Sequence, residues 1–224
     1  MKDQKGWMIY LQGREGLTVH GGRWAALALL IFAGVLPAQT SSPPDNSLWA
    51  NGLGNGFRSD AQNLTLTAGA VGGLPIFGSQ QAHDLALASL AYGHMLGSPV
   101  GSNHWFRGNW EGRLELFAGA EFSPDSTWLV GFTPHLRYDF ATGTHWIPFL
   151  DAGAGVTAVG IGQPDLSSTF EFNLQGGPGV RWFIRDNLAL TLEARYFHIS
   201  DAGLTQPNRG VNGVAGMIGA AWFF

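Results

Sequence analysis

The chain has 224 residues, of which 33 are glycine, and a net charge of −4 at neutral pH; Asp, Glu, Lys and Arg make up only 12%. Soluble domains usually carry about twice that share of charged residues. Because cysteine is absent, disulfides, cysteine nucleophiles and thiolate metal sites are excluded. The negative net charge also gives no indication of a nucleic-acid partner.

Residues 1–38 have the pattern of an export signal. Cations outnumber anions before an apolar run from Trp24 to Leu36, and Leu36-Pro37-Ala38 provides a cleavage site after Ala38. The alternative, a single membrane anchor helix, is disfavoured because the apolar run is too short to span a bilayer. We therefore predict a cleaved signal peptide over 1–38. Residues 39–62, rich in Ser, Pro, Asn and Gly, are predicted to form an irregular linker or plug-like segment.

From residue 63 to the end, short segments of alternating apolar and polar residues recur between turns. In 127–140, for example, Trp128 and Phe132 share one parity, whereas His135 and Arg137 share the other. Such alternation is typical of strands with two different faces. The predicted strands are residues 63–71, 83–95, 108–121, 127–140, 146–160, 170–184, 188–200 and 212–224.

Two kinds of barrel could produce this alternation. A soluble, lipocalin-like barrel would turn its apolar face inward. A transmembrane barrel would turn that face toward lipid and pack its charged residues inside. Aromatic residues at the ends of the apolar faces, an even strand count and the terminal Phe224 favour the second. We therefore predict an all-β fold, an eight-stranded antiparallel transmembrane β-barrel of the outer membrane over residues 63–224. The side chains expected inside it are Arg113, Arg137, Arg181, Arg195, Glu111, Glu115, Glu171 and Glu193.

Three prolines fall within predicted strands: Pro134, Pro148 and Pro178. Each removes one hydrogen-bond donor from the strand ladder, and such prolines are usually found at edges or bulges. We expect β-bulges at these positions.

His198 and Ser200 stand out near the end of the predicted strand 188–200. Residues two apart in a strand point to the same side, so an imidazole and a hydroxyl lie next to each other. This is the minimum for a serine nucleophile activated by a base. Exported barrels begin and end in the periplasm, which places the pair at the extracellular end, on the lipid-facing side. The alternative is that both are ordinary polar residues in the headgroup zone.

The segment from His198 to Asn212, HISDAGLTQPNRGVN, resembles the C-terminal motif of the PagL-type lipid A 3-O-deacylases, also called acyloxyacyl hydrolases. The resemblance implies an outer-wall site on an eight-stranded barrel. It also implies hydrolysis of the ester-linked 3-hydroxyacyl chain of lipid A, with lipopolysaccharide of the outer leaflet as substrate. Ser200 would be the nucleophile, His198 the general base and the Gly203 N–H an oxyanion donor, with no metal or organic cofactor.

The chain departs from this family pattern at two positions. Asn212 stands where the best-known members carry the orienting Glu, and Asp201 stands where they usually carry Asn. Either Asn212 or Asp201 could serve as the third residue of the site. If Asn212 orients the imidazole, Asn212→Glu would raise the rate; if Asp201 does so, Asp201→Asn would be the damaging change. A second oxyanion donor is identified only weakly as Asn173, because its parity is inward.

The alternative function is a non-catalytic structural barrel of the OmpA/OmpX kind, in which His198 and Ser200 have no joint role. An outer-membrane phospholipase is disfavoured because that class uses a larger barrel. A porin is disfavoured because side chains fill an eight-stranded interior. We expect no nucleic-acid partner, and the sequence leaves open whether the protein is a monomer or a homodimer.

Overall fold

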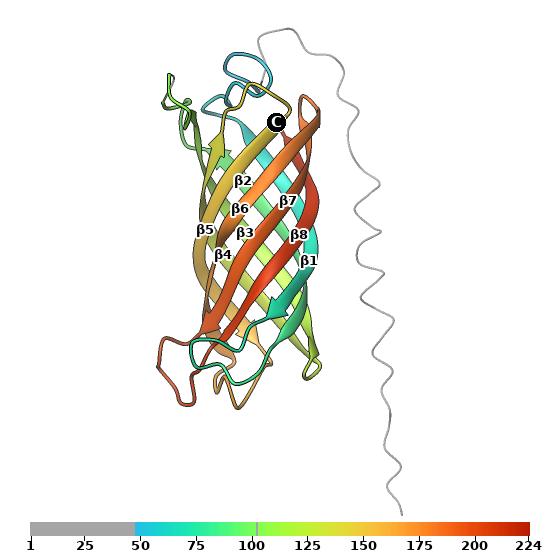
Figure 1. Ribbon diagram of the computed structural model, residues 1–224, viewed down its shortest axis with the longest axis vertical. Helices are drawn as coiled ribbons and strands as arrows, with labels where there is room; N and C mark the ends of the chain where they lie inside the picture. Colours follow the sequence, from blue (N-terminus) through green and yellow to red (C-terminus); the bar gives the residue numbers. More distant parts are fainter. Residues whose placement is uncertain (1–47, 102) are drawn as a thin grey trace, which may run out of the picture. The chain divides into compact units, whose positions relative to one another are not determined.

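The computed structural model describes residues 48–101 and 103–224, so the predicted signal peptide lies outside the described residues. Within them, eight strands form one closed antiparallel barrel, in which each strand pairs with its neighbours in sequence and β8 returns to β1 (Figure 1). These residues contain no helix long and apolar enough to cross a membrane. The strands are β1 (Gln62–Gly73), β2 (Asp84–Met95), β3 (Gly108–Ser123), β4 (Thr127–Phe140), β5 (Trp146–Val159), β6 (Phe170–Arg185), β7 (Leu188–Ser200) and β8 (Val211–Phe223). The predicted fold class is confirmed.

The charged parity of the strands faces the barrel interior, as predicted. All eight Arg and Glu side chains expected inside are at most 3% exposed. Trp128, Phe132 and Trp182 are instead 51%, 37% and 42% exposed on the outer wall. A soluble barrel with an apolar interior is therefore excluded, and the outer wall is suited to lipid.

Ion pairs join the buried charges across the barrel. Arg137 contacts Asp151 with its Nε at 2.8 Å and Glu193 with its Nη2 at 3.0 Å. Arg181 contacts Asp139 at 2.7 Å and Glu111 at 2.8 Å. Buried charges without such partners would be strongly destabilising. The network explains how a membrane barrel tolerates a charged interior.

Apolar layers lie above and below this charged belt, a feature that the sequence analysis did not anticipate. The segment before β1, residues 48–61, inserts Trp49 and Phe57 into the end of the barrel where β1 begins and β8 ends, which we call the periplasmic end. Phe57 stacks on Phe223 with ring centroids 5.0 Å apart, and Trp49 meets Phe183 edge-on at 4.8 Å. The described part of the predicted plug-like segment therefore closes this end.

The prolines do not cause the bulges expected at them. The β3–β4 register passes through the pair Leu114↔Pro134 unchanged, and the two irregularities of register fall elsewhere, near Asp84 and near Phe183. All three prolines are exposed on the outer wall. Neighbouring ladder pairs hold the register on either side, so the loss of single donors is tolerated without an inserted residue.

At the opposite, extracellular end, two connections are tied together. His83 joins Glu121 through Nδ1 at 2.6 Å and Asp165 through Nε2 at 3.0 Å, and all three side chains are buried. Asp165 also accepts the backbone N–H groups of Gln80 at 2.7 Å and Gln81 at 2.9 Å. Although burial acts in the opposite direction, these hydrogen bonds hold the pKa of Asp165 below its usual value.

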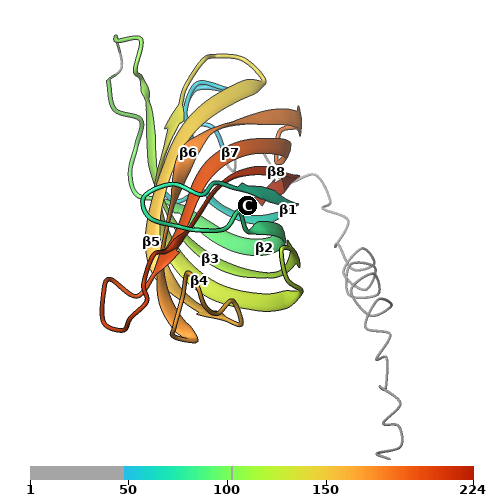
Figure 2. The same ribbon diagram turned by 60° about the horizontal axis from the view of Figure 1, so that its bottom comes forward.

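We call His83, Glu121 and Asp165 the loop clasp. It fastens the β1–β2 connection, residues 74–83, to the β5–β6 connection, residues 160–169. Figure 2 brings this end of the barrel forward, and the β1–β2 connection, in teal, extends across it. The clasp therefore fixes a loop beside the strand ends that carry the candidate site.

Candidate active site

Strand β7 presents His198 and Ser200 side by side on the outer wall, both half-buried. The distance from His198 Nε2 to Ser200 Oγ is 2.9 Å, which is within hydrogen-bond reach. The i, i+2 spacing of a strand therefore produces the contact expected between a base and a nucleophile.

Strand β8 places Asn212 directly opposite His198 in the register. Asn212 Oδ1 lies 2.8 Å from His198 Nδ1, on the side of the ring away from Ser200. Tyr196, two residues before His198, donates its hydroxyl to the same oxygen at 2.6 Å. Asn212 is only 1% exposed although its parity is outward, because residues of the β1–β2 connection cover it.

The hydrogen bonds of Asn212 determine where the imidazole carries its proton. The Asn212 Nδ2 donates to the carbonyl of Ile76 at 3.0 Å. A carbonyl oxygen can only accept, so the amide nitrogen must face Ile76 and the amide oxygen must face His198. His198 Nδ1 then carries the proton, and Nε2 is left unprotonated to accept the Ser200 hydroxyl. This tautomer is the one that a general base requires.

Gly210 supports the other side of the imidazole. Its φ is +77°, and a Cβ added there would lie 2.9 Å from His198 Cε1. Only glycine combines this backbone conformation with this close approach at little cost.

We expect Gly210→Ala to reduce hydrolysis, because the added methyl group would push the imidazole away from Ser200. Displacements of about 1 Å can cost up to about a hundredfold in rate. The measurement is kcat for ester hydrolysis by the folded variant in detergent. Gly52→Ala is a matched control, since Gly52 has φ +86° with no atom within 4 Å of the added Cβ. Equal rates for the two variants would contradict the role of Gly210.

Asp201, the other candidate for the third residue, is not brought to His198. Its carboxylate accepts the hydroxyl of Thr205, the N–H of Thr205 at 2.7 Å and the N–H of Gly203 at 2.9 Å. These bonds, with that of the Thr205 hydroxyl the strongest, hold the pKa of Asp201 below its usual value. Asp201 therefore stays charged at neutral pH and organises the β7–β8 turn, while Asn212 contacts the imidazole.

Neither of the two oxyanion donors suggested by the sequence has a free N–H group beside Ser200 in the structure. The Gly203 N–H is engaged by Asp201, so this donor is occupied in the structure. The physical reason is the carboxylate at position 201, which attracts the nearby N–H groups of its own turn. Asn173 is 1% exposed inside the barrel, where it bonds Thr133 at 2.8 Å and Thr157 at 2.9 Å. It cannot reach the outer wall.

Sequence reasoning missed two contributors to the site, the Tyr196 hydroxyl and the Ile76 carbonyl. The parity of Tyr196, shared with His198, was a signal that could have identified it. No local signal identifies Ile76, because its contact with Asn212 joins positions 136 residues apart.

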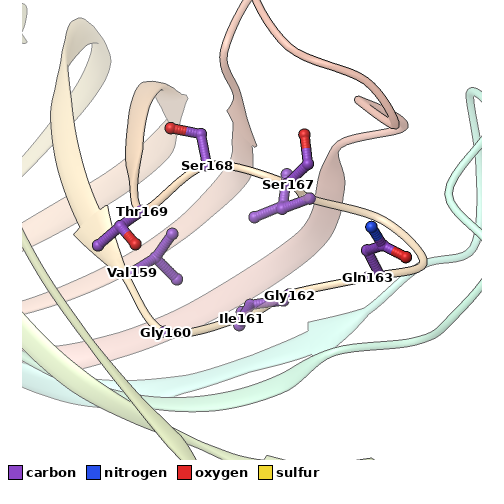
Figure 3. Close-up of a pocket in the computed structure, with 9 residues that line it drawn as sticks. Val159, Gly160, Ile161, Gly162, Gln163, Ser167, Ser168 and Thr169 are labelled. Atoms are coloured by element: carbon purple, nitrogen blue, oxygen red, sulfur yellow. The ribbon is translucent and has the colours of Figure 1, made fainter.

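A pocket of about 250 Å³ lies within the β5–β6 connection, apart from these residues. Figure 3 shows its lining, in which Ser167, Ser168 and Thr169 supply hydroxyls. No histidine or carboxylate lines it, so no base is available there to activate these hydroxyls. The cavity is therefore not the candidate site.

The fold defines an eight-stranded barrel of the outer-membrane class, with a His-Ser pair on its lipid-facing wall. The chain belongs to the lipid A 3-O-deacylase (PagL) family, whose sequence profile matches residues 87–221, more than half of the chain. This membership supports the outer membrane as the location of the barrel.

Two curated relatives are both named lipid A deacylase PagL. The one from Pseudomonas aeruginosa is 34% identical over 85 residues, covering 37% of this chain and 46% of the relative. The one from Bordetella bronchiseptica is 29% identical over 127 residues, covering 51% of this chain and 66% of the relative. The alignments thus span less than two thirds of either relative.

The barrel is also similar to the crystal structure of the outer membrane enzyme PagL. The TM-score is 0.52 at 22% sequence identity, with 70% of this chain and 97% of that chain covered. At this level of identity the similarity shows the fold.

Proposed function

We propose that this protein is a serine esterase that removes the ester-linked 3-hydroxyacyl chain from lipid A of the outer leaflet. The observation that carries the proposal is the continuous hydrogen-bonded series from Ser200 through His198 to Asn212, with spacings of 2.9 Å and 2.8 Å. Family membership supports lipid A as the substrate class. A structural barrel of the OmpA/OmpX kind would not need this arrangement.

In the proposed mechanism, Ser200 Oγ attacks the ester carbonyl carbon while His198 Nε2 accepts the hydroxyl proton. The tetrahedral intermediate collapses to an acyl-enzyme, and His198 returns the proton to the departing sugar oxygen. Water then attacks the acyl-enzyme while His198 Nε2 accepts a proton from it, and His198 passes that proton to the departing Ser200 Oγ. The products are a 3-hydroxy fatty acid and lipid A with a free hydroxyl group. This chemistry requires no metal or organic cofactor.

Asn212 holds the imidazole by accepting from Nδ1–H, as the amide does in Cys-His-Asn enzymes. It offers less stabilisation of the imidazolium than a carboxylate would. We propose Gly203 N–H as the oxyanion donor, which becomes free when Asp201 releases it to the incoming substrate. Catalytic hydrogen bonds often form fully only when substrate is bound.

The surface around Ser200 suits an acyl chain. In the register, Ser200 lies opposite Phe172, and His198 lies opposite Leu174 on one side. Phe172, Leu174 and, on β8, Val214 are 40%, 52% and 50% exposed. An ester of a lipid embedded in the outer leaflet could therefore reach Ser200 laterally while its chain stays in an apolar environment. One chain supplies all three residues, so the proposal needs no second subunit.

The test is mass spectrometry of lipid A incubated with the purified, folded barrel. We expect the loss of one 3-hydroxyacyl group and the release of the matching free fatty acid. Lipid A that lacks the ester-linked chain at the 3-position, but keeps its amide-linked chains, is the matched control and should stay intact. Unchanged lipid A in both samples would favour the structural barrel. Loss of a different acyl chain would mean that the enzyme cleaves an ester at another position of lipid A.

A further inference from the structure

The β1–β2 connection contacts the side chain of Asn212 through the backbone carbonyl of Ile76. The carbonyl of Ile76 accepts from Asn212 Nδ2 at 3.0 Å and from the N–H of Ser79 at 3.2 Å. Leu74 N–H also donates to the Asn212 carbonyl at 2.8 Å, which continues the β1–β8 pairing past the end of β1. Backbone hydrogen bonds before and after Ile76 thus hold its carbonyl against the side-chain donor of Asn212.

The turn that aims this carbonyl depends on residues with unusual backbone angles. Phe77 has φ +54° and Gly78 has φ +103°, and the Ile76–Ser79 hydrogen bond closes the turn. Phe77 is 82% exposed, so its side chain contributes little packing. Immediately after the turn, Asp165 of the loop clasp accepts the N–H groups of Gln80 and Gln81.

Because residue 212 is an amide and not a carboxylate, its contact with the Ile76 carbonyl decides which of its side-chain atoms faces His198. A carboxylate offers an acceptor to the imidazole in either orientation, whereas an amide does so in only one. Without the Ile76 carbonyl, Asn212 could rotate to present its NH₂ group to His198. His198 would then carry its proton on Nε2, the wrong nitrogen for a base beside Ser200. In a serine protease, an amide that imposes the wrong tautomer costs about 10⁴-fold in kcat.

We propose that the first extracellular connection is a positioning element of the site: the Ile76 carbonyl, aimed by the Phe77 turn and anchored by the loop clasp, selects the working orientation of Asn212. The proposal rests on the proposed esterase function. It also reverses the expectation from sequence that Asn212→Glu would raise the rate. A carboxylate at position 212 would set a second buried acceptor against the Ile76 carbonyl, and such an unpaired contact is costly.

The test compares Phe77→Pro with Phe77→Gly. Both remove the exposed aromatic side chain, but proline fixes φ near about −65° and cannot keep the turn, whereas glycine can. The first readout is the ¹⁵N NMR signature of the His198 tautomer, assigned by its absence in His198→Ala. We expect the Nδ1–H form in the wild type and in Phe77→Gly, and a shift toward the Nε2–H form in Phe77→Pro. This readout does not depend on hydrolysis.

The second readout is kinetic. We expect Phe77→Pro to lower kcat by about tenfold or more, with KM close to that of Phe77→Gly. In the Asn212→Asp background, a carboxylate has no orientation to select and is opposed by the Ile76 carbonyl, so the same change should not lower kcat. Folding of each variant is verified by gel electrophoresis in detergent, in which a folded barrel migrates differently before and after heating. If Phe77→Pro does not fold, Asp165→Asn, which weakens the clasp, replaces it with the same expectations.

An unchanged His198 tautomer in the folded loop variant would overturn the proposal. So would an equal loss of kcat in the wild-type and Asn212→Asp backgrounds, since that would mean a general disturbance of the site. A wild-type rate no higher than that of Ser200→Ala would instead contradict the esterase function, while the tautomer readout would still decide the role of the loop.

Discussion

Ser200→Ala is expected to abolish ester hydrolysis while the barrel still folds. The hydroxyl is the group that would form the acyl-enzyme, and alanine leaves nothing for His198 to activate. Removing a nucleophile of this kind typically costs about 10⁴-fold or more in kcat. Because Ser200 is half-buried on the outer wall, the loss of one oxygen should change stability little.

The measurement is the release of 3-hydroxy fatty acid from lipid A by equal amounts of folded protein. Ser167→Ala is the matched control, since this serine also makes a hydroxyl contact, but to the Thr205 hydroxyl at 2.7 Å and not to a histidine. The control should keep the wild-type rate. Release by Ser200→Ala at more than a small fraction of that rate would exclude Ser200 as the nucleophile.

Arg137→Met is expected to produce the largest loss of stability among the substitutions considered. Arg137 is fully buried, pairs with Asp151 and Glu193, and lies 3.7 Å over the ring of Phe149. Methionine would keep much of the packing but leave two carboxylates short of a cation inside the barrel. Breaking a buried ion pair in this way costs about 3–5 kcal/mol.

Urea-induced unfolding in detergent micelles would give the change in free energy. Arg58→Met is the matched control, because Arg58 pairs with Asp60 at 3.4 Å on the exposed surface. Exposed pairs contribute about 0–1 kcal/mol. If Arg137→Met lowered the free energy of unfolding as little as the control does, the buried ion pairs of Arg137 would not stabilise the barrel.

The barrel could be predicted from sequence because the alternation of apolar and polar residues in a strand indicates directly which side of the sheet each side chain faces. Parity alone placed Arg137 inside and Trp128 outside, as the structure confirms. Phe197 and Ile199 share the inward parity of Arg195, yet the apolar layers above and below the charged belt were not anticipated. Those layers depend on which residues meet across the barrel, and a single strand does not encode this.

The site shows the same division between local and distant information. The His198–Ser200 contact follows from strand spacing, and the opposition of His198 and Asn212 follows from the β7–β8 hairpin. The occupation of the Gly203 N–H by Asp201 is set by the geometry of a turn. The Ile76 contact comes from the β1–β2 connection, which the loop clasp holds with residues from three separate parts of the chain.

The most direct test of a serine activated by His198 is labelling with a fluorophosphonate, which reacts with nucleophilic hydroxyl groups. Peptide mass spectrometry of the labelled, folded barrel should find one adduct, on Ser200, and the adduct should disappear in His198→Ala. An adduct that persists at Ser200 without His198 would contradict the account. The account would also be contradicted if the protein hydrolysed lipid A while its Ser200 did not react with the fluorophosphonate.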